Sequence, residues 1–250
     1  MKIKTILVSQ PPPTDEKSPY FDLARKYSLK IDFKPFIQVK AVDGQEFRQE
    51  RINILDHTAI VLTSKNAVDH FFRMCKELRL TVPESMKYFC ITENVAYYVQ
   101  KYIVYRKRKV FIGKQTIGDL MDVIKKHKDE VYLVPSSDIQ TGDIPDKLQK
   151  AGVKFSSAVF YRTVANDMSD VKDLKKYDML VFFSPGGIES LRKNFPDFKQ
   201  DGTFIAAFGP ATAKAVEENG YRLDLQAPLP EAPSMTGAIE LFIKRLAKKK

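Results

Sequence analysis

A strand-to-helix pattern occurs twice in this chain of 250 residues. Residues 61–73 read VLTSKNAVDHFFR, and residues 181–193 read VFFSPGGIESLRK, so the two copies are offset by 181 − 61 = 120 positions. In each copy an apolar run ends at a serine, and an amphipathic helical pattern begins immediately afterwards. This recurrence predicts two copies of one α/β unit.

Three further pairs of segments keep the same order and nearly the same offset. They are residues 91–99 with 208–216, residues 116–126 with 235–245, and residues 26–39 with 150–163. Short apolar runs such as AIVLT, VYLVP and MLVFF alternate with helical patterns along the chain. This alternation favours parallel sheets covered by helices. The alternative is that any two α/β stretches align somewhere along their length.

The formal net charge of +10 predicts attraction to anionic partners,. The basic clusters at residues 106–109 and 248–250 are interpreted as solvated charge, because they lack interleaved aromatic residues and no nucleic-acid module is recognisable,. No apolar run is long enough to span a bilayer, and the N-terminal run is too short for a secretory signal. Cys75 and Cys90 suggest no disulfide framework,. We therefore expect a cytoplasmic protein with no membrane or nucleic-acid partner.

Polar and small residues stand at the ends of the predicted strands. Ligands of open α/β sheets bind beyond the carboxyl ends of the strands, so two copies facing each other across a cleft would line one shared site. Serines there suit N-caps, glycines allow close approach, and free N–H groups at a helix start attract carboxylate or phosphate. The alternative for each loop is capping and turn formation alone. The predicted binding residues are Ser9, Thr63, Ser64, Lys65, Asn66, Asn94, Ser136, Ser137, Ser184, Pro185, Gly186, Gly187, Gly209, Pro210, Ala211 and Thr212.

The sequence lacks the motifs of metal, nucleotide and triad enzymes. No Cys/His cluster, Walker loop, dinucleotide fingerprint or Gly-x-Ser-x-Gly elbow is present,. His57, His70 and His127 lack metal-ligand spacing, and each is expected at the surface. An enzyme of this sequence is therefore predicted to use no cofactor and no metal.

Tyr161, in the segment AVFYRTV, is a candidate catalytic residue. Strand alternation predicts that its side chain points opposite to those of its neighbours. A tyrosine there can donate a proton or a hydrogen bond to a leaving hydroxyl. The alternative is an ordinary strand aromatic.

Four segments together resemble the uroporphyrinogen-III synthase family. They are VLTSKNAVDHFF, AVFYRTV, LVFFSPGGIESL and residues 204–242, which read FIAAFGPATAKAVEENGYRLDLQAPLPEAPSMTGAIELF. The resemblance covers nearly the whole chain in order. It implies an α/β fold of two similar flavodoxin-like parallel-sheet domains, joined by a two-stranded linker and separated by a cleft.

The resemblance also implies that the two domains exchange their opening β-α-β segments. A plain tandem would divide near residue 128. The family fold instead places residues 1–36 plus 165–250 in the first domain and residues 40–160 in the second. Residues 37–39 and 161–164 are then the linker strands, within crossing strands predicted over residues 31–42 and 158–164.

The activity implied by the resemblance is that of a cofactor-independent lyase of tetrapyrrole (haem) biosynthesis. Hydroxymethylbilane loses its terminal hydroxyl as water and closes with ring D inverted, giving uroporphyrinogen III. By resemblance, Tyr161 assists hydroxyl departure, Ser64 and Ser184 end the paired strands, and Thr212 keeps one of two loop hydroxyls, while Ala211 replaces the other. Two residues depart from the family pattern. Gln10 stands where many members have a cationic arginine, and Glu93 would repel the carboxylates of the substrate,.

A monomer that binds only its small-molecule substrate is expected. Two alternatives remain from the residues themselves. One is a non-catalytic two-domain module that binds an acidic small metabolite, and the other is a nucleic-acid binder that uses residues 106–109,.

Overall fold

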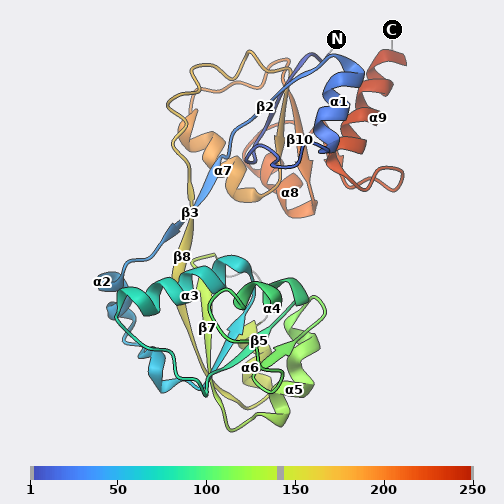
Figure 1. The fold of residues 1–250 in the computed structure, drawn as a ribbon. Coiled ribbons are helices and arrows are strands. Elements are labelled where there is room, and N and C mark those ends of the chain that lie inside the picture. Colours follow the sequence, from blue (N-terminus) through green and yellow to red (C-terminus); the bar gives the residue numbers. More distant parts are fainter. Residues whose placement is uncertain (1–2, 140–143, 249–250) are drawn as a thin grey trace. The chain divides into compact units, whose positions relative to one another are not determined.

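The computed structural model describes residues 3–139 and 144–248, which form two compact units (Figure 1). Unit 1 comprises Met1–Gln38 and Val164–Lys250, and unit 2 comprises Val39–Thr163. The chain therefore leaves unit 1 after Gln38 and returns to it after Thr163. Residues 249–250 of the predicted C-terminal basic cluster lie outside the described residues.

Unit 1 is built on a five-stranded sheet in the order β11-β10-β9-β1-β2, in which every neighbouring pair is parallel. The strands are β1 (Thr5–Val8), β2 (Lys30–Phe33), β9 (Met179–Phe182), β10 (Phe204–Phe208) and β11 (Leu225–Ala227). The helices are α1 (Pro19–Tyr27), α7 (Pro185–Asn194), α8 (Pro210–Glu218) and α9 (Met235–Lys248). Apolar residues of α1 and α9 pack with one set of strand residues, and those of α7 and α8 pack with another, so helices cover both faces.

Unit 2 carries most of a second sheet, in the order β3-β8-β7-β4-β5-β6. The strands are β3 (Ile37–Ala41), β4 (Ala59–Leu62), β5 (Lys87–Cys90), β6 (Val110–Ile112), β7 (Val131–Ser137) and β8 (Lys154–Ala165). The helices are α2 (Gly44–Phe47), α3 (Lys65–Glu77), α4 (Glu93–Val99), α5 (Met121–Lys126) and α6 (Ile144–Lys150), with 3₁₀ helices η1 (Arg48–Glu50), η2 (Ile54–Asp56) and η3 (Ile117–Leu120). Helices α3 and α4 pack in one core, and η3, α5 and α6 pack in another.

The central strands explain why the apolar runs in the sequence are continuous. Every residue of β4 and of β9 is buried, because helices cover both faces of a parallel sheet,. Strands of this kind read as unbroken apolar segments, whereas strands with one wet face alternate.

The two sheets share one strand order when the sequence copies are superposed. The order β2-β1-β9-β10-β11 in unit 1 corresponds to β8-β7-β4-β5-β6 in unit 2. Helices α3 and α4 then correspond to α7 and α8, as the repeated segments of the sequence predict. The β-α-β segment that opens the chain in unit 1 has its counterpart at the end of unit 2, from β7 to β8.

The prediction of one crossing strand over residues 31–42 is wrong. The strand β2 ends at Phe33 and β3 begins at Ile37, and the two belong to different sheets. Pro35 lies in the break, where its missing N–H cannot continue a ladder,. Phe36 is almost fully buried, and its carbonyl accepts hydrogen bonds from the Asn166 amide at 2.8 Å and from the Ser190 hydroxyl.

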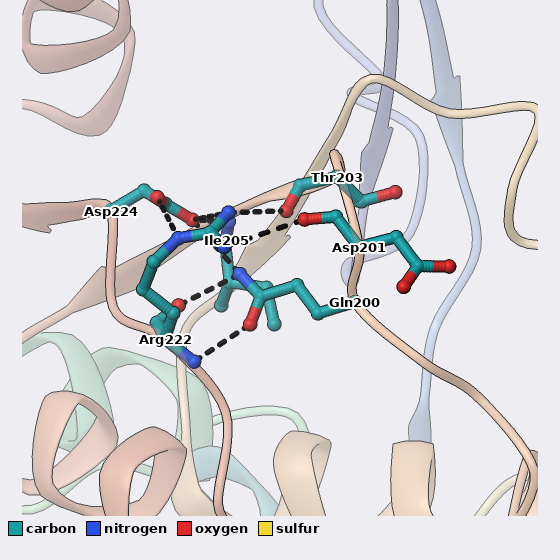
Figure 2. A network of polar contacts seen from close by, with 6 residues as sticks. All are labelled: Gln200, Asp201, Thr203, Ile205, Arg222 and Asp224. Atoms are coloured by element: carbon teal, nitrogen blue, oxygen red, sulfur yellow. Dashed lines mark hydrogen bonds and ion pairs between the residues drawn. The ribbon is translucent and has the colours of Figure 1, made fainter.

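A polar network in unit 1 fixes the approach to the edge strand β11 (Figure 2). The Asp224 carboxylate accepts from the Ile205 amide at 2.9 Å, from Gln200 Nε2 at 2.9 Å and from Arg222 Nε at 2.7 Å. Gln200 and Arg222 also exchange two bonds, since Gln200 Nε2 donates to the Arg222 carbonyl and the Arg222 amide donates to Gln200 Oε1. The Asp224 side chain is only 10% exposed, so its hydrogen-bond partners depend on this carboxylate, rather than on water, as their acceptor.

Replacing Asp224 with alanine is expected to lower the free energy of unfolding by about 1–3 kcal/mol, because the Ile205 amide loses its carboxylate acceptor in a part-buried position,. Urea unfolding of the variant measures the effect. Asp197→Ala is the matched control, since Asp197 is exposed and lies outside this network. Equal stability of the two variants would contradict the structural role of the network.

Candidate functional site

A pocket of about 330 Å³ lies in unit 2 at the carboxyl ends of its strands. Thr63 and Ser64 line it from the turn after β4, Ser136 and Ser137 line it from the end of β7, and Tyr161 lines it from β8. The sequence predicted these five residues for the site, and the structure brings them together. The remaining lining residues are Ile91, Val134, Pro135, Ile139, Ile144, Pro145 and Ser157.

The position of this pocket follows from the strand order. From β4 the sheet continues through β5 and β6 on one side, while β7 and β8 lie on its other side. The helices that follow β4 and β7 therefore depart on either side of a topological switch point, where open α/β sheets bind ligands. Thr63, Ser64, Ser136 and Ser137 lie at this point.

A one-residue irregularity in β8 determines how Tyr161 faces the pocket. Ser136 pairs with Val159, but Ser137 pairs with Tyr161, so β8 holds an extra residue there. Such a β-bulge redirects a side chain. Phe160 and Tyr161 are consequently both buried in one core cluster, and the prediction that Tyr161 points opposite to its neighbours is wrong for Phe160.

The bulge is held by hydrogen bonds to its backbone. The Phe160 carbonyl accepts from the Val42 amide at 3.1 Å and from Arg73 Nη2 at 3.5 Å. Arg73 also donates to the Val42 carbonyl, so this side chain of α3 ties the bulge to the segment that follows β3. The backbone is therefore fixed immediately before Tyr161.

The Tyr161 side chain contacts two residues of the strand-to-helix segment that the sequence repeats. Its hydroxyl lies 3.5 Å from Ser64 Oγ, which is longer than an ordinary O–H···O hydrogen bond,. Its ring stacks on His70, with centroids 4.9 Å apart and planes inclined by 22°. His70 was expected at the surface but is part-buried. Its Nδ1 is buried without a hydrogen-bond partner among the described residues.

Ser64 caps α3, as the sequence predicts. Its hydroxyl accepts from the Ala67 amide at 3.1 Å.

Ser157 was missed by the sequence reasoning, and its hydroxyl is buried with no partner in the described chain, although it lines the pocket. Ser136 Oγ already donates to the Ala158 carbonyl, and Ser137 Oγ donates to Asp138 Oδ1. Ser157 is therefore the serine of this pocket whose hydroxyl has no hydrogen-bond partner among the described residues, although its oxygen is buried.

Three further predicted residues of unit 2 lie outside this pocket. Lys65, Asn66 and Asn94 are exposed in the first turns of α3 and α4 and are not part of the pocket lining. Lys65 Nζ lies 5.3 Å from the centre of the Tyr98 ring, which is within the range of a cation–π contact,. These side chains occupy the surface around the strand ends.

The predicted residues of unit 1 gather at its own strand ends. Ser184 caps α7 by accepting from the Gly187 amide at 3.3 Å. A Cβ atom at Gly187 would lie 3.7 Å from Ser184 Oγ and 3.9 Å from Ser9 Oγ, so both hydroxyls lie close to this glycine. The strands β1 and β9, which end before these serines, flank the switch point of unit 1,.

The start of α8 differs from the starts of α3 and α7. Gly209 has φ = +82°, a conformation that favours glycine, and no side chain caps this helix,. Pro210 and Ala211 are exposed there, and the first-turn N–H groups are uncapped by side chains. Thr212 is only 2% exposed, so its hydroxyl does not face solvent in this structure.

The expectation of surface histidines is also wrong for His57. This residue is 6% exposed, and its Nδ1 lies 2.9 Å from the Asn53 carbonyl oxygen. His127 is part-buried, and its ring packs on Phe111 with centroids 4.6 Å apart. Within residues 3–139 and 144–248, no group of three or more His, Cys, Asp or Glu side chains is arranged to hold a metal ion. No helix in that part of the chain is long and apolar enough to cross a membrane.

Fold and site together define an α/β protein with parallel sheets, whose strand-end pocket presents hydroxyls from serines and one tyrosine. A model of the family described as uroporphyrinogen-III synthase HemD matches residues 18–237. The chain belongs to the uroporphyrinogen-III synthase family.

Individual relatives agree with this family. The uroporphyrinogen-III synthase of Saccharomyces cerevisiae is 29% identical over 141 residues, which are 50% of this chain and 50% of that protein. The chain thus matches about half the length of this curated relative. A uroporphyrinogen-III synthetase structure from Helicobacter pylori has a TM-score of 0.63 at 15% identity, covering 97% of this chain and all of that one. A mutant uroporphyrinogen III synthase from Thermus thermophilus has a TM-score of 0.54 at 15% identity, covering 99% and 100%. At this identity the two structures show a shared fold.

Acidification is expected to destabilise the protein through His70. Burial lowers the pKa of His70, and the Arg73 charge lowers it further, against the opposing effect of Asp69. Below about pH 6.5, the usual histidine pKa, the unfolded chain therefore takes up a proton more readily than the folded chain does, so stability falls with pH. His70→Phe keeps a ring on Tyr161 and removes this titration.

Urea unfolding at about pH 7.5 and about pH 5.5 measures the difference. The His70→Phe variant is expected to lose less stability on acidification than the natural chain does. An identical loss in both proteins would contradict the assigned environment of His70.

Proposed function

We propose that the protein converts hydroxymethylbilane into uroporphyrinogen III, with loss of one water molecule and without a cofactor. The observation that carries the proposal is the juxtaposition of Tyr161 and Ser64 in a strand-end pocket of a chain that belongs to this family. The family and the yeast relative carry the name uroporphyrinogen-III synthase, which supports the same activity here, and the H. pylori and T. thermophilus structures support the fold.

Tyr161 is proposed to assist departure of the terminal hydroxyl. Its O–H group can donate to the leaving oxygen as the C–O bond breaks, so that oxygen departs as water. The methylene carbon left behind is then attacked by the substituted carbon of the last ring, giving a spiro intermediate. That intermediate fragments and recloses with ring D inverted, and the one proton lost on closure balances the proton that Tyr161 donated. Ser64 lies 3.5 Å from the Tyr161 oxygen and can hold the same leaving group or the departing water. General acid assistance of this kind contributes about 10²- to 10⁴-fold in rate.

His70 is proposed as a positioning residue that acts through Tyr161. The stacked imidazole fixes the phenol ring, and the bulge held by Arg73 fixes its backbone. Holding a reacting group in place removes part of the entropic barrier. The low pKa of His70, caused mainly by burial, keeps the imidazole neutral near pH 7, so no second cation is added beside Arg73.

The carboxylates of the substrate are proposed to bind at helix starts. The N–H groups of a first helical turn and the helix dipole favour negative charge, and the net charge of +10 raises the local concentration of an anion,. The start of α8 at Gly209, Pro210 and Ala211 suits this best, because its N-cap residue Gly209 has no side chain to occupy the helix donors. Ser184 and Ser64 use one N–H of their helices each and leave others.

The finer domain description is proposed with the function. Each sheet places its strands in a doubly wound order, and the order in unit 1 is that of flavodoxin-like folds, which supports two such domains,. We propose residues 1–36 plus 165–250 as one domain and 40–160 as the other, with 37–39 and 161–164 as linker strands. The pairing of β3 with β8 supports this linker. The cleft that the family resemblance implies stays a prediction.

The proposed setting is a monomer in the cytoplasm. Cys75 and Cys90 are buried and unpaired, as expected in a reducing compartment,. The alternative of a non-catalytic module for an acidic metabolite uses the same strand ends, but it gives no role to the Tyr161–Ser64 pair.

The purified protein, supplied with fresh hydroxymethylbilane, is expected to give mainly isomer III, because the bound chain is held in the geometry of the inverted closure. Chromatography of the oxidised products measures the ratio of isomer III to isomer I. Heat-inactivated protein is the control for spontaneous closure. Accumulation of isomer I alone, at the spontaneous rate, would show that the proposed activity is wrong.

Tyr161→Phe is expected to lower kcat by about 100-fold or more, because the variant keeps the ring and loses the proton donor. His70→Ala is expected to lower kcat in the natural background, with little change in KM, and to have almost no further effect in the Tyr161→Phe background. His70→Phe, which keeps a stacked ring, should restore the rate. If the double variant instead showed the summed losses of kcat of the two single variants, His70 would not act through Tyr161 and its proposed positioning role would be wrong.

A further inference from the structure

Unit 2 contains a second pocket, of about 210 Å³, that the proposed reaction does not use. Its apolar wall is formed by Phe72 of α3, Tyr88 of β5, and Tyr102 and Ile103 of the connection between α4 and β6. Arg106 and Lys109 stand on its rim. The pocket therefore combines an apolar wall with a positively charged rim.

This pocket lies at the opposite edge of the sheet from the strand-end site. Its residues Val82 and Met86 lead into β5, and residues 102–109 lead into β6. Segments that enter parallel strands lie at the amino edge, whereas Thr63 and Ser64 follow a strand at the carboxyl edge. A ligand in this pocket can bind while the strand-end site is occupied.

The aromatic wall is fixed before any ligand arrives. The Phe72 and Tyr102 rings are stacked, with centroids 4.5 Å apart and planes within 3°. The Tyr102 hydroxyl donates to Asp69 Oδ1 at 2.6 Å, and this bond raises the pKa of Tyr102 to about 12, so the donor stays protonated. A wall that needs no ordering lowers the entropic cost of binding.

The rim carries positive charge that the described residues neutralise only in part. Arg106 Nη2 lies 3.5 Å from Glu84, but Lys107, Arg108 and Lys109 form no ion pair with any described residue. The neighbouring Val104 is 81% exposed, which is unusual for an apolar side chain beside four cations. The surface therefore offers charge complementarity to carboxylates and apolar area next to it.

The volume of this pocket indicates which class of ligand it can hold. Pockets for whole small molecules measure roughly 300–1,000 Å³, so this pocket is too small for most of them, but it suits one large side chain that anchors a protein interface,. A bilayer would leave the recess unfilled, and a nucleic acid would bring no aliphatic anchor to it. We propose that the pocket docks an acidic protein segment, which inserts one large apolar side chain beside Phe72 and Tyr102 and places Asp or Glu carboxylates on residues 106–109.

Fluorescence anisotropy with the full chain tests this docking site. The probe is a labelled peptide with one central phenylalanine flanked by glutamates, and the comparison peptide has alanine in place of the phenylalanine. The first peptide is expected to bind at least about tenfold more tightly than the second, since burial of the ring contributes to affinity. Its affinity is also expected to weaken between about 50 mM and about 300 mM salt.

Lys107→Glu/Arg108→Glu is the test variant, and both positions are exposed. It should weaken binding of the phenylalanine peptide by at least about tenfold. Arg192→Glu/Lys193→Glu in the last turn of α7 is the matched control, because it changes the same residue types and the same charge in unit 1. It should leave binding unchanged, and urea unfolding should show that both variants are folded.

Equal affinity for the two peptides, or equal loss in the two double variants, would overturn the proposal. Single-stranded DNA and vesicles containing phosphatidylserine are assayed in parallel. If either binds through Lys107 and Arg108 while the peptide does not, the assignment to an acidic protein segment is wrong. These results do not depend on the isomer ratio, so the docking site and the proposed reaction can fail separately.

Discussion

Parallel strand pairing is the constraint on which the rest of this structure depends. In each sheet the parallel strands bring their carboxyl ends to one edge, so residues far apart in the sequence meet there,. Ser64 and Tyr161 are neighbours for this reason, although 97 positions separate them. The same pairing directs the segments that enter the strands to the opposite edge, where the aromatic pocket lies. One sheet therefore supports two separate surfaces with different chemistry.

Much of the fold was predictable because helices cover both faces of each sheet. Strands buried on both faces appear in the sequence as unbroken apolar runs, and β4 and β9 were predicted in this way,. The repeat was visible for a related reason, since equivalent strands and helices of the two copies need similar apolar positions. The break between β2 and β3 was missed because residues 31–42 keep a strand-like pattern on both sides of Pro35.

The candidate site was predictable only in outline. Serines at strand ends were identified from local capping chemistry, which depends on neighbouring residues alone,. Ser157, the stacking of His70 and the bulge beside Tyr161 depend on pairing between distant segments, which no local pattern reveals. His57 was misjudged for the same reason, because its burial depends on how its loop packs. The expected roles of Lys65, Asn66 and Asn94 remain predictions.

The interrupted path of the chain has a consequence for its synthesis on the ribosome. Unit 2 is contiguous, so all of its own residues have been made once Thr163 has emerged,. Unit 1 must wait, because β1 pairs with β9, and the hydrogen bond from the Thr5 amide to Asp178 spans 173 positions. Until then the β1-α1-β2 segment has an unpaired strand edge and an uncovered apolar face. The β1-α1-β2 segment is therefore synthesised before unit 2 but completes its pairing only after unit 2 has been made.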